Sequence, residues 1–524
     1  MKSVVYLSFL LLFANLFATN LPVDQLIGEC GTLKMLQNLR AGMKFPRPPN
    51  GPKYIYSTHF VIHFDTTGTR AVTRAQAESV SVWAEHSWAK QVDTLGWDEP
   101  PPDNNHGVDN RYDIYLMGVD PGGYLGVTFA DEPGPDPNQE DWTSWIELTI
   151  NPNRQVTRPL VAHEFNHACQ FSCSGYEGGW WYENTSEWME KITMGVDHGR
   201  VGGGSDNPDP LEDPHVEITC DDDGYEYAGG LWPRFLGEYW SVILPRQIWS
   251  LCGIHFEGHT LEDMDSVLRL YYDSDLKKAL GHYAIWRYFT GNRGDIYHFS
   301  EGASYVTSTI LRTHSTYPAS GNQGTSNPSG PGGCNFIQFR NFGNNRVTLY
   351  FDGENGYEWS AYVIGKRGGI SYEYKIPLES TQDTGRITIP GWEYDTIALI
   401  PVVTHWTSSA ESLTYSYNVT LGDELAAITE PTNIYFNLTL DIYPNPVRTQ
   451  TTIRYLIPNG KNGKLKIYDA TGKAVRNFEL MGNKGPASIL WDKKDKYGRT
   501  VKSGIYFVHL MVDDKTISKK MVIE

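Results

Sequence analysis

A stretch of low complexity divides this chain into two parts with different patterns. Residues 313–333 consist largely of Ser, Gly, Pro and Asn, as in the run HSTYPASGNQGTSNPSGPGG. Such a composition offers too little apolar surface to form a core, so we expect a linker here. The 524 residues are also about three times the usual length of one domain, which favours two to four domains.

The part before the linker predicts an α+β domain over residues 20–312, with an N-terminal arm over residues 20–53. Strand-like runs occur in its first half, and helical patterns dominate its second half. The expected strands are residues 59–64, 112–117 and 145–150, and the expected helices are residues 71–95, 160–171, 182–194, 228–240, 261–271 and 276–289. The arm is either a propeptide or a simple extension.

The part after the linker has an all-β pattern. Short apolar runs recur with turn residues between them, as in Ig-like sandwiches. A second break near residues 429–432 separates an accessory β-sandwich over residues 334–428 from a last β domain over residues 440–524. The fold class is therefore multidomain, with an α+β domain followed by two all-β domains.

The N-terminus predicts export. An apolar run from Val4 to Ala18 follows Lys2, and it is too short to span a bilayer. Small and polar residues come next, so residues 1–19 are expected to be a cleaved signal peptide. No later run approaches about 20 apolar residues, and no transmembrane span is expected in the mature chain. Six cysteines permit disulfides in an exported protein without revealing their pairing.

Charge and motifs exclude several classes of function. Lys and Arg number 44 against 62 Asp and Glu, which gives 44 − 62 = −18 and argues against nucleic acid as a partner. The sequence has no GxSxG elbow, no phosphate-binding GxxxxGK motif and no dinucleotide-binding GxGxxG motif. The cysteines are scattered without CxxC spacing, so a cysteine zinc site is not expected.

The strongest local signal is the HExxH motif that runs from His163 to His167. On a helix, positions i and i+4 share a face, so both imidazoles can point at one metal ion. Glu164 lies on the adjacent flank, where it can reach a water molecule bound to that ion. The motif predicts a Zn²⁺ site with Glu164 as general base, against the alternative of a chance match among 15 histidines.

The next helical run offers a third ligand. Two histidines and one carboxylate form the ligand set of many catalytic zinc sites, with the fourth position left for water. We predict Glu183 as this ligand, with Glu187 as its chief substitute. Glu187 lies one turn later and is expected to accept a hydrogen bond from a ligand histidine. Glu190 is assigned to the solvated face of the helix.

An HExxH motif followed by a helix of the form Glu-x-x-x-acid resembles the gluzincin metallopeptidases, the group that contains thermolysin and the zinc aminopeptidases. In that group the first Glu is the zinc ligand, which here is Glu183, and Glu187 is the acid that follows. The motifs lie a few residues closer together here, and residues 184–186, Asn-Thr-Ser, replace a more usual small and apolar sequence.

Residues 57–306, roughly half of the chain, are similar to a group of secreted bacterial metalloproteinases. The similar segments are residues 57–60, LGW at 95–97, RYDIYL at 111–116, HExxHxxQ at 163–170 and YAIWRYFTG at 283–291. The resemblance implies a zinc-dependent hydrolytic site that acts on protein or peptide substrates. In such a reaction Glu164 takes a proton from the attacking water and delivers it to the leaving amine.

The reaction also needs a hydrogen-bond donor for the tetrahedral oxyanion. Related enzymes often use a downstream Tyr or His, and Tyr225 and Tyr227 are the candidates here. The alternative is that these tyrosines only pack in the core.

Two other clusters have weaker patterns. His255 and His259 are also four residues apart, but Gly253 and Gly258 favour a loop over a helix. The run Asp221 to Asp223 suggests Ca²⁺, yet it lacks the remainder of a twelve-residue binding loop, so calcium has no support beyond these residues.

The last segment resembles the C-terminal sorting domain of the type IX secretion system. The resemblance rests on YPNP at residues 443–446, a strand at 464–469, SGIY at 503–506 and a Lys-rich end at 519–520. It implies an Ig-like sandwich that binds the type IX secretion machinery, and a protein secreted from, or held at the surface of, a diderm bacterium. A generic Ig-like module is the alternative.

The sequence therefore predicts a secreted zinc metalloprotease. The main alternative is a catalytically silent surface adhesin whose zinc site is structural or degraded, which a fourth protein ligand or a blocked site would favour. A hydrolase of non-peptide bonds is a further alternative, because the ligand set does not name the bond that is cleaved.

Overall fold

The computed structural model describes most of the chain. The described residues are 30–68, 71–117, 124–149, 158–196, 201–202, 208–255, 258–322, 326–379, 383–409, 411–422, 428–436, 439–457, 461–481, 487–512 and 515–524. They form two compact units, one of residues 1–201 with 226–273 and one of residues 202–225 with 274–524. The predicted signal peptide, residues 1–19, lies outside the described residues.

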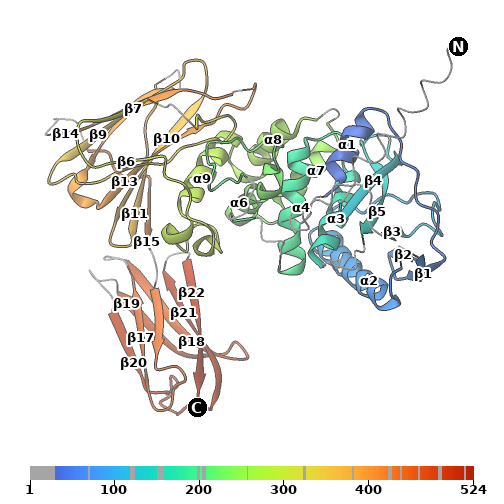
Figure 1. Cartoon of the computed structure of the whole chain (residues 1–524). Coiled ribbons are helices and arrows are strands. Elements are labelled where there is room, and N and C mark those ends of the chain that lie inside the picture. Colours follow the sequence, from blue (N-terminus) through green and yellow to red (C-terminus); the bar gives the residue numbers. More distant parts are fainter. Residues whose placement is uncertain are drawn as a thin grey trace. The chain divides into compact units, whose positions relative to one another are not determined.

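The first unit is built on a five-stranded mixed sheet (Figure 1). In spatial order its strands are β1 (Lys53–Tyr56), β2 (Phe60–Phe64), β3 (Tyr112–Met117), β5 (Trp142–Thr149) and β4 (Gly126–Pro133). The three central strands run parallel, and each outer strand is antiparallel to its neighbour. All residues of β2 are buried, as expected for a central strand covered on both faces. Strand β4 therefore forms one edge of the sheet.

Helices complete the first unit (Figure 1). They are α1 (Thr32–Arg40), α2 (Arg74–Trp88) with the π-helix η3 (Ala89–Thr94), α3 (Arg158–Phe171), α4 (Gly179–Met194), α6 (Leu231–Tyr239), α7 (Leu244–Cys252) and α8 (Thr260–Tyr272). A capping box starts α2, in which Thr73 Oγ1 accepts a hydrogen bond from the Gln76 N–H at 3.2 Å. Phe165 of α3 contacts Phe60 of β2 and Trp88 of α2, with ring centroids 5.4 and 5.7 Å apart.

The predicted helices and strands of this unit correspond to α2, α3, α4, α8, β2, β3 and β5. The predicted helix over residues 228–240 is split, because α5 (Tyr225–Ala228) ends before Gly229 and α6 begins at Leu231. The sequence did not predict α1, α7, β1 or β4. These elements are short and carry no sustained period, so their packing partners decide their conformation.

The second unit begins with a β-sandwich (Figure 1). One sheet has the order β15-β11-β10-β13-β8-β6 and the other has the order β12-β9-β14-β7. The strands are β6 (Arg312–His314), β7 (Ala319–Asn322), β8 (Ile337–Phe339), β9 (Arg346–Gly353), β10 (Trp359–Arg367), β11 (Ile370–Lys375), β12 (Thr384–Pro390), β13 (Thr396–Val403), β14 (Tyr415–Gly422) and β15 (Asn433–Phe436). Helix α9 (Leu276–Tyr288) packs against β10 and β13, so residues 274–312 group with this sandwich and not with the predicted first domain.

The predicted linker is part of this sandwich. Strands β6 and β7 lie within or at the start of residues 313–333. Backbone hydrogen bonds hold the remainder, with Ser329 N–H donating to His215 O and Gly332 N–H donating to Val403 O, each at 2.9 Å. The prediction of a linker was wrong because it rested on composition alone. Backbone hydrogen bonds, which Gly and Ser form as well as other residues, hold this segment without large apolar side chains.

The C-terminal residues form a second sandwich, with sheets in the order β16-β17-β20 and β19-β18-β21-β22. Its strands are β16 (Thr439–Tyr443), β17 (Thr451–Leu456), β18 (Asn462–Asp469), β19 (Ala474–Met481), β20 (Ala487–Trp491), β21 (Gly504–Val512) and β22 (Lys515–Ile523). The core includes Trp491, Val508 and Leu510. Among the described residues of the whole chain, the helices are too short or too polar to cross a membrane.

A buried ion cluster attaches the N-terminal arm to the sheet. Arg47 donates hydrogen bonds to Asp113 of β3 at 2.5 Å, to Asp131 of β4 at 3.1 Å and to Asp103. The guanidinium also lies 5.1 Å from the ring centroid of Trp145. Only 11% of the Arg47 side chain is exposed, and it is the cation that all three carboxylates share, although His63 also contacts Asp113 at 2.7 Å and His106 contacts Asp131 at 3.3 Å.

We predict that Arg47→Met destabilises the first unit by about 3–5 kcal/mol, because it leaves buried carboxylates without a cation. Urea unfolding followed by tryptophan fluorescence measures the change. Arg74→Met is the matched control, since the Arg74–Glu78 pair at 2.8 Å is exposed and its loss should move the midpoint little. Equal midpoints for both variants would contradict a role for Arg47 as an anchor.

Candidate metal centre

Helices α3 and α4 bring the three predicted ligands together. His163 and His167 lie one turn apart on α3, and their Nε2 atoms are 3.1 Å from each other. Glu183 of α4 places Oε2 at 3.1 Å from His163 Nε2 and Oε1 at 3.6 Å from His167 Nε2. All three side chains are buried. The arrangement agrees with the i, i+4 geometry expected from the sequence.

The second nitrogen of each imidazole is held by an acceptor. His163 Nδ1 lies 3.1 Å from Glu190 Oε1, and His167 Nδ1 lies 2.7 Å from Gln170 Oε1. The Gln170 amide nitrogen donates to Tyr182 O at 3.0 Å and to Thr185 Oγ1 at 2.9 Å, which fixes the amide oxygen toward His167. Both Nδ1 atoms therefore face acceptors, which leaves both Nε2 atoms directed at Glu183 and at each other.

Of the two acidic residues after Glu183, Glu190 and not Glu187 lies at hydrogen-bond distance from a ligand histidine, and both are buried. Glu187 was predicted to orient a ligand histidine, but its Oε1 lies 3.8 Å from His163 Nδ1. Glu190, assigned to a solvated face, is buried and lies at hydrogen-bond distance from that nitrogen. The correction follows from helix geometry, because α4 is covered on nearly all sides and its solvated face is absent over residues 180–190.

The cluster fits a zinc ion. Two imidazole Nε2 atoms and a carboxylate converge in a buried space, and a metal ion there would be held by three donor atoms of the types that zinc prefers. Ligand atoms in a tetrahedral zinc site lie roughly 3.3–3.8 Å apart, given metal–ligand distances of about 2.0–2.3 Å. The separations of 3.1, 3.1 and 3.6 Å among His163, His167 and Glu183 are close to that range. Oε1 of Glu183 has no hydrogen-bond partner among the described residues, as expected of a ligand atom.

Cys30 joins this cluster, and the sequence gave no sign of it. Its Sγ lies 3.3 Å from His167 Nε2, and the ligand atoms of Cys30, His163, His167 and Glu183 all lie within 4.8 Å of one another. The thiol is 5% exposed. It is separated from His167 by 137 residues, so no spacing motif could reveal it. A possible signal was that Cys30 is the lone cysteine of the N-terminal arm.

The side chain of Glu164 extends from α3 toward the edge strand β4. Thr128 Oγ1 donates to its Oε2 at 2.8 Å, and Oε1 has no hydrogen-bond partner among the described residues. Burial raises the pKa of Glu164 to about 7. Gly126 makes this approach possible, because a Cβ there would lie 2.5 Å from Glu164 Oε1. The carboxylate thus has one fixed oxygen and one that is available for a proton.

The surroundings shift the other titratable groups in the metal-free protein. Burial lowers the pKa of His167 to about 4. Burial also opposes protonation of His163, but hydrogen bonds to Cys30, Glu183 and Glu190 raise its pKa well above the usual value. Burial, together with Glu164 and Glu183, raises the pKa of the Cys30 thiol. The histidines therefore differ strongly although they belong to one motif.

The two candidate oxyanion donors have different surroundings. Tyr227 donates from its hydroxyl to the backbone oxygen of Cys30 at 3.1 Å, so it lies beside the metal centre. Tyr225 belongs to the second unit, where its hydroxyl donates to Val216 O at 3.4 Å. Tyr227 is therefore the tyrosine of this pair that the structure brings next to the cluster.

The structure confirms the predictions for the two weaker clusters, a loop at His255 and His259 and a solvated turn at residues 221–223. His255 and His259 lie between α7 and α8, and His255 Nδ1 contacts Asp263 Oδ1 at 2.5 Å, which confirms the predicted loop. Asp221, Asp222 and Asp223 are exposed, as predicted for a solvated turn. All six cysteines are free thiols in this structure.

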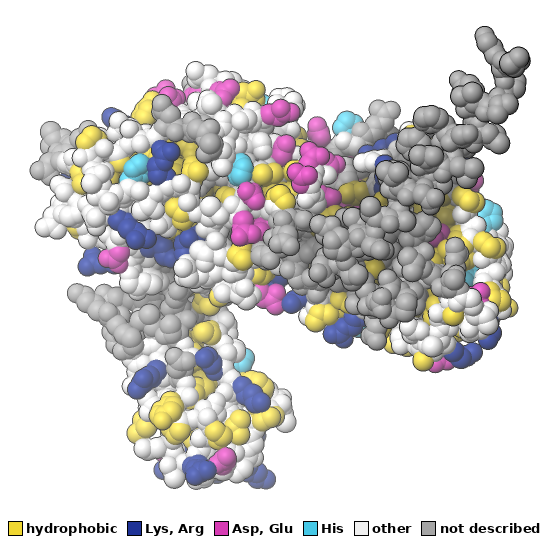
Figure 2. Space-filling model, in the orientation of Figure 1, with side chains coloured by type: hydrophobic (Ala, Val, Ile, Leu, Met, Phe, Trp, Pro, Cys, Tyr) yellow, Lys and Arg dark blue, Asp and Glu magenta, His cyan; other side chains and the backbone are white. Residues whose placement is uncertain are grey.

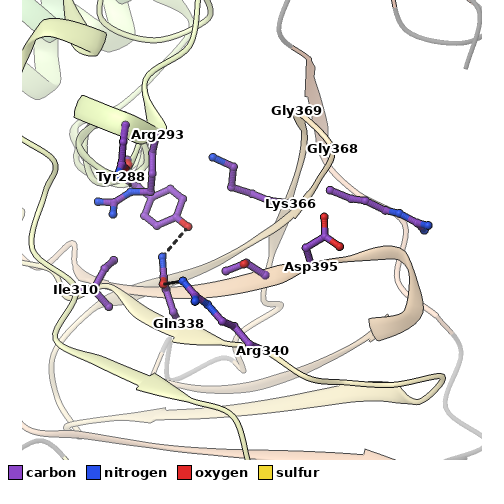
Figure 3. Close-up of a pocket in the computed structure, with 12 residues that line it drawn as sticks. Tyr288, Arg293, Ile310, Gln338, Arg340, Lys366, Gly368, Gly369 and Asp395 are labelled. Atoms are coloured by element: carbon purple, nitrogen blue, oxygen red, sulfur yellow. Dashed lines mark hydrogen bonds between the residues drawn. The ribbon is translucent and has the colours of Figure 1, made fainter. Parts of the chain in front are cut away.

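A separate cavity of about 310 Å³ lies in the second unit (Figure 3). Arg293, Arg340, Lys366 and Arg367 line it, with Asp395 as the acidic residue of the lining. Figure 3 shows Gln338 between Tyr288 and Arg340, joined to both by hydrogen bonds of 3.5 and 3.3 Å. The excess of cations favours an anionic ligand.

The comparisons with known proteins identify the end of the chain. Residues 441–524 match the secretion system C-terminal sorting domain family. This part is therefore a type IX sorting domain, and the protein is secreted or held at the cell surface. Figure 2 shows apolar and cationic side chains over this domain, and its exposed apolar residues include Tyr443, Met481 and Tyr497. It is the part of the chain that interacts with the secretion machinery.

Other matches cover little of the chain. None of the curated proteins matches it. PorZ, a surface component of the type IX secretion system of Porphyromonas gingivalis, is 22% identical over 17% of this chain and 14% of its own, with a TM-score of 0.14. Latent PorU from the same species is 16% identical over 34% of this chain and 18% of its own, with a TM-score of 0.16. A β-glucuronidase from Parabacteroides merdae is 13% identical over 35% of this chain and 26% of its own, with a TM-score of 0.13.

We predict that the purified chain binds one zinc ion and that Glu190→Gln weakens this binding by about 10–100-fold, because the ligand histidine loses its orienting carboxylate. Competition with a chromophoric chelator measures the affinity. Glu187→Gln is the matched control on the same helix, and its effect should be smaller because Glu187 lies 3.8 Å from His163 Nδ1. Equal losses in both variants would contradict the assignment of Glu190.

Proposed function

We propose that the protein is a secreted zinc metallopeptidase whose catalytic domain is zincin-like. The observation that supports this most is the convergence of His163, His167 and Glu183 beside a buried carboxylate, Glu164, that keeps one oxygen available. Two histidines and a glutamate are a catalytic ligand set, whereas structural zinc sites mostly use cysteine and histidine. Peptide hydrolysis is the reaction that the gluzincin resemblance suggests for this set.

Each residue has a defined task in this proposal. A bound Zn²⁺ lowers the pKa of water and polarises a carbonyl oxygen. Glu164 accepts the proton of the attacking water on Oε1 and then donates it to the leaving nitrogen. Its pKa of about 7 suits both transfers near neutral pH. Glu190 and Gln170 keep the imidazoles oriented, and the burial of the cluster limits access of bulk water.

Strand β4 is the natural place for an extended substrate. It forms an edge of the sheet, and its residues Gly126 and Thr128 lie against Glu164. A peptide that adds to such an edge gains main-chain hydrogen bonds along its length. The backbone of a substrate would then run past the carboxylate that acts on it. Tyr227 is the tyrosine of the predicted pair that can assist there.

A second candidate function is a surface adhesin with a structural zinc site. The observation in its favour is Cys30, because four protein ligands in a buried cluster describe a closed site. The cationic cavity of the second unit would then bind an anionic partner. The availability of Glu164 Oε1 favours the enzyme, since a structural site gains nothing from a buried carboxyl group there.

The test removes the thiol and then the general base. We predict that Cys30→Ser hydrolyses casein and that a chelator abolishes this activity. Cys30→Ser with Glu164→Gln should keep its zinc, because Glu164 is not a ligand, and should lose roughly 10²–10⁴-fold in rate. Metal analysis and casein hydrolysis are measured on the same samples. Zinc without hydrolysis in Cys30→Ser, and also in Cys30→Ser with Gly31→Val, whose added side chain cannot fit against Val127 of β4, would sink the enzyme and favour the adhesin.

A further inference from the structure

The N-terminal segment that carries Cys30 lies against the features that define the proposed site. Gly31 N–H donates to Gly126 O at 3.0 Å, and Cys30 forms a parallel bridge with Gly126 of β4. Thr128 N–H donates to Thr32 Oγ1 at 3.1 Å. The segment therefore occupies part of the sheet edge that an extended substrate would use.

The same segment reaches into the metal centre. Cys30 Sγ lies 3.3 Å from His167 Nε2, and Thr32 Oγ1 lies 3.5 Å from Glu164 Oε2. Cysteine thiolates bind zinc strongly, and a sulfur in this position completes four protein ligands. Substrate or water would then have no open coordination position.

We propose that Cys30 is the fourth metal ligand and that residues 30–40 hold the intact chain in a latent state. This inference rests on the proposed peptidase function. The thiolate fills the metal position, and the backbone of Cys30 and Gly31 fills the adjacent edge of β4. The thiolate at the metal and the backbone at β4 block the site together, because the residue that supplies the sulfur is also the one that pairs with Gly126.

The structure allows this segment to leave while the remainder of the arm stays. Helix α1 ends at Arg40, and residues 40–44 are exposed. Beyond them, Arg47 is anchored in the sheet by Asp113 and Asp131. The latent contacts of Cys30 and the permanent contacts of Arg47 are therefore separated by an exposed stretch.

Gly31 offers a second way to disturb the segment. A Cβ at this position would lie 2.4 Å from Val127 Cγ2 and 3.0 Å from the Tyr124 ring. The substitution Gly31→Val must therefore move the segment away from β4. Cys30→Ser removes the ligand atom alone, and Cys30→Ser with Gly31→Val removes both blocks.

The experiment uses the full chain loaded with zinc, and its first readout is X-ray absorption at the metal. We expect the parent and the control Cys220→Ser to show one sulfur at about 2.3 Å from zinc, and Cys30→Ser to show only nitrogen and oxygen. Cys220 is a matched control because its half-buried thiol belongs to the second unit. A parent spectrum without sulfur would overturn the assignment of Cys30.

The second readout is casein hydrolysis by the same samples. We expect the parent and Cys220→Ser to be slow, and Cys30→Ser or its Gly31→Val double variant to be faster by roughly tenfold or more. Equal hydrolysis by the parent and both open variants would overturn latency while the peptidase function stands. A sulfur ligand in the parent with no hydrolysis in any variant would overturn both, and would leave a closed structural site.

Discussion

The first unit depends on the burial of two imidazoles and a carboxylate in one small space. The Nε2 atoms of His163 and His167 lie 3.1 Å apart, and the carboxylate of Glu183 faces both. In the metal-free chain a protonated His163 offsets the charge of Glu183, in line with its raised pKa. A metal ion would take the place of that proton, while Glu190 and Gln170 hold the Nδ1 atoms. The packing of α3 against α4 is therefore linked to metal binding.

The edge strand β4 extends this dependence to the sheet. Its Gly126 has no side chain, so Glu164 can approach the strand, and Thr128 fixes one carboxylate oxygen. The same short stretch pairs with Gly31. The general base, the proposed substrate edge and the N-terminal segment thus meet at Gly126 and Thr128 of one strand. A change at Gly126 should affect all three, whereas a change at the distant exposed pair Arg74–Glu78 should affect none.

The local parts of this arrangement could be predicted from the sequence, and the contacts between distant residues could not. The spacing of His163 and His167 fixes their common face, and the next helix had to supply the carboxylate. The orienting role of Glu190 was missed because a helix pattern gives the angle of a residue but not which neighbour covers it. Cys30 was missed because its contact with His167 joins residues that are 137 positions apart in the chain. The type IX sorting domain was predicted because its motifs recur in fixed order within 84 residues, 441–524.

The element that carries each ligand decides whether a metal site with four protein ligands can open. His163, His167 and Glu183 come from two helices that pack on each other and on the sheet, so they cannot separate without loss of the core. Cys30 comes from a segment whose apolar anchors within the first turns of α1 are Met35 and Leu36, and an exposed stretch follows it. A structural zinc site gains stability by joining elements that must stay together. A ligand from a short segment at the edge of the fold is better suited to be exchanged, because α3, α4 and the sheet keep their own packing when α1 moves away from β4 and α4.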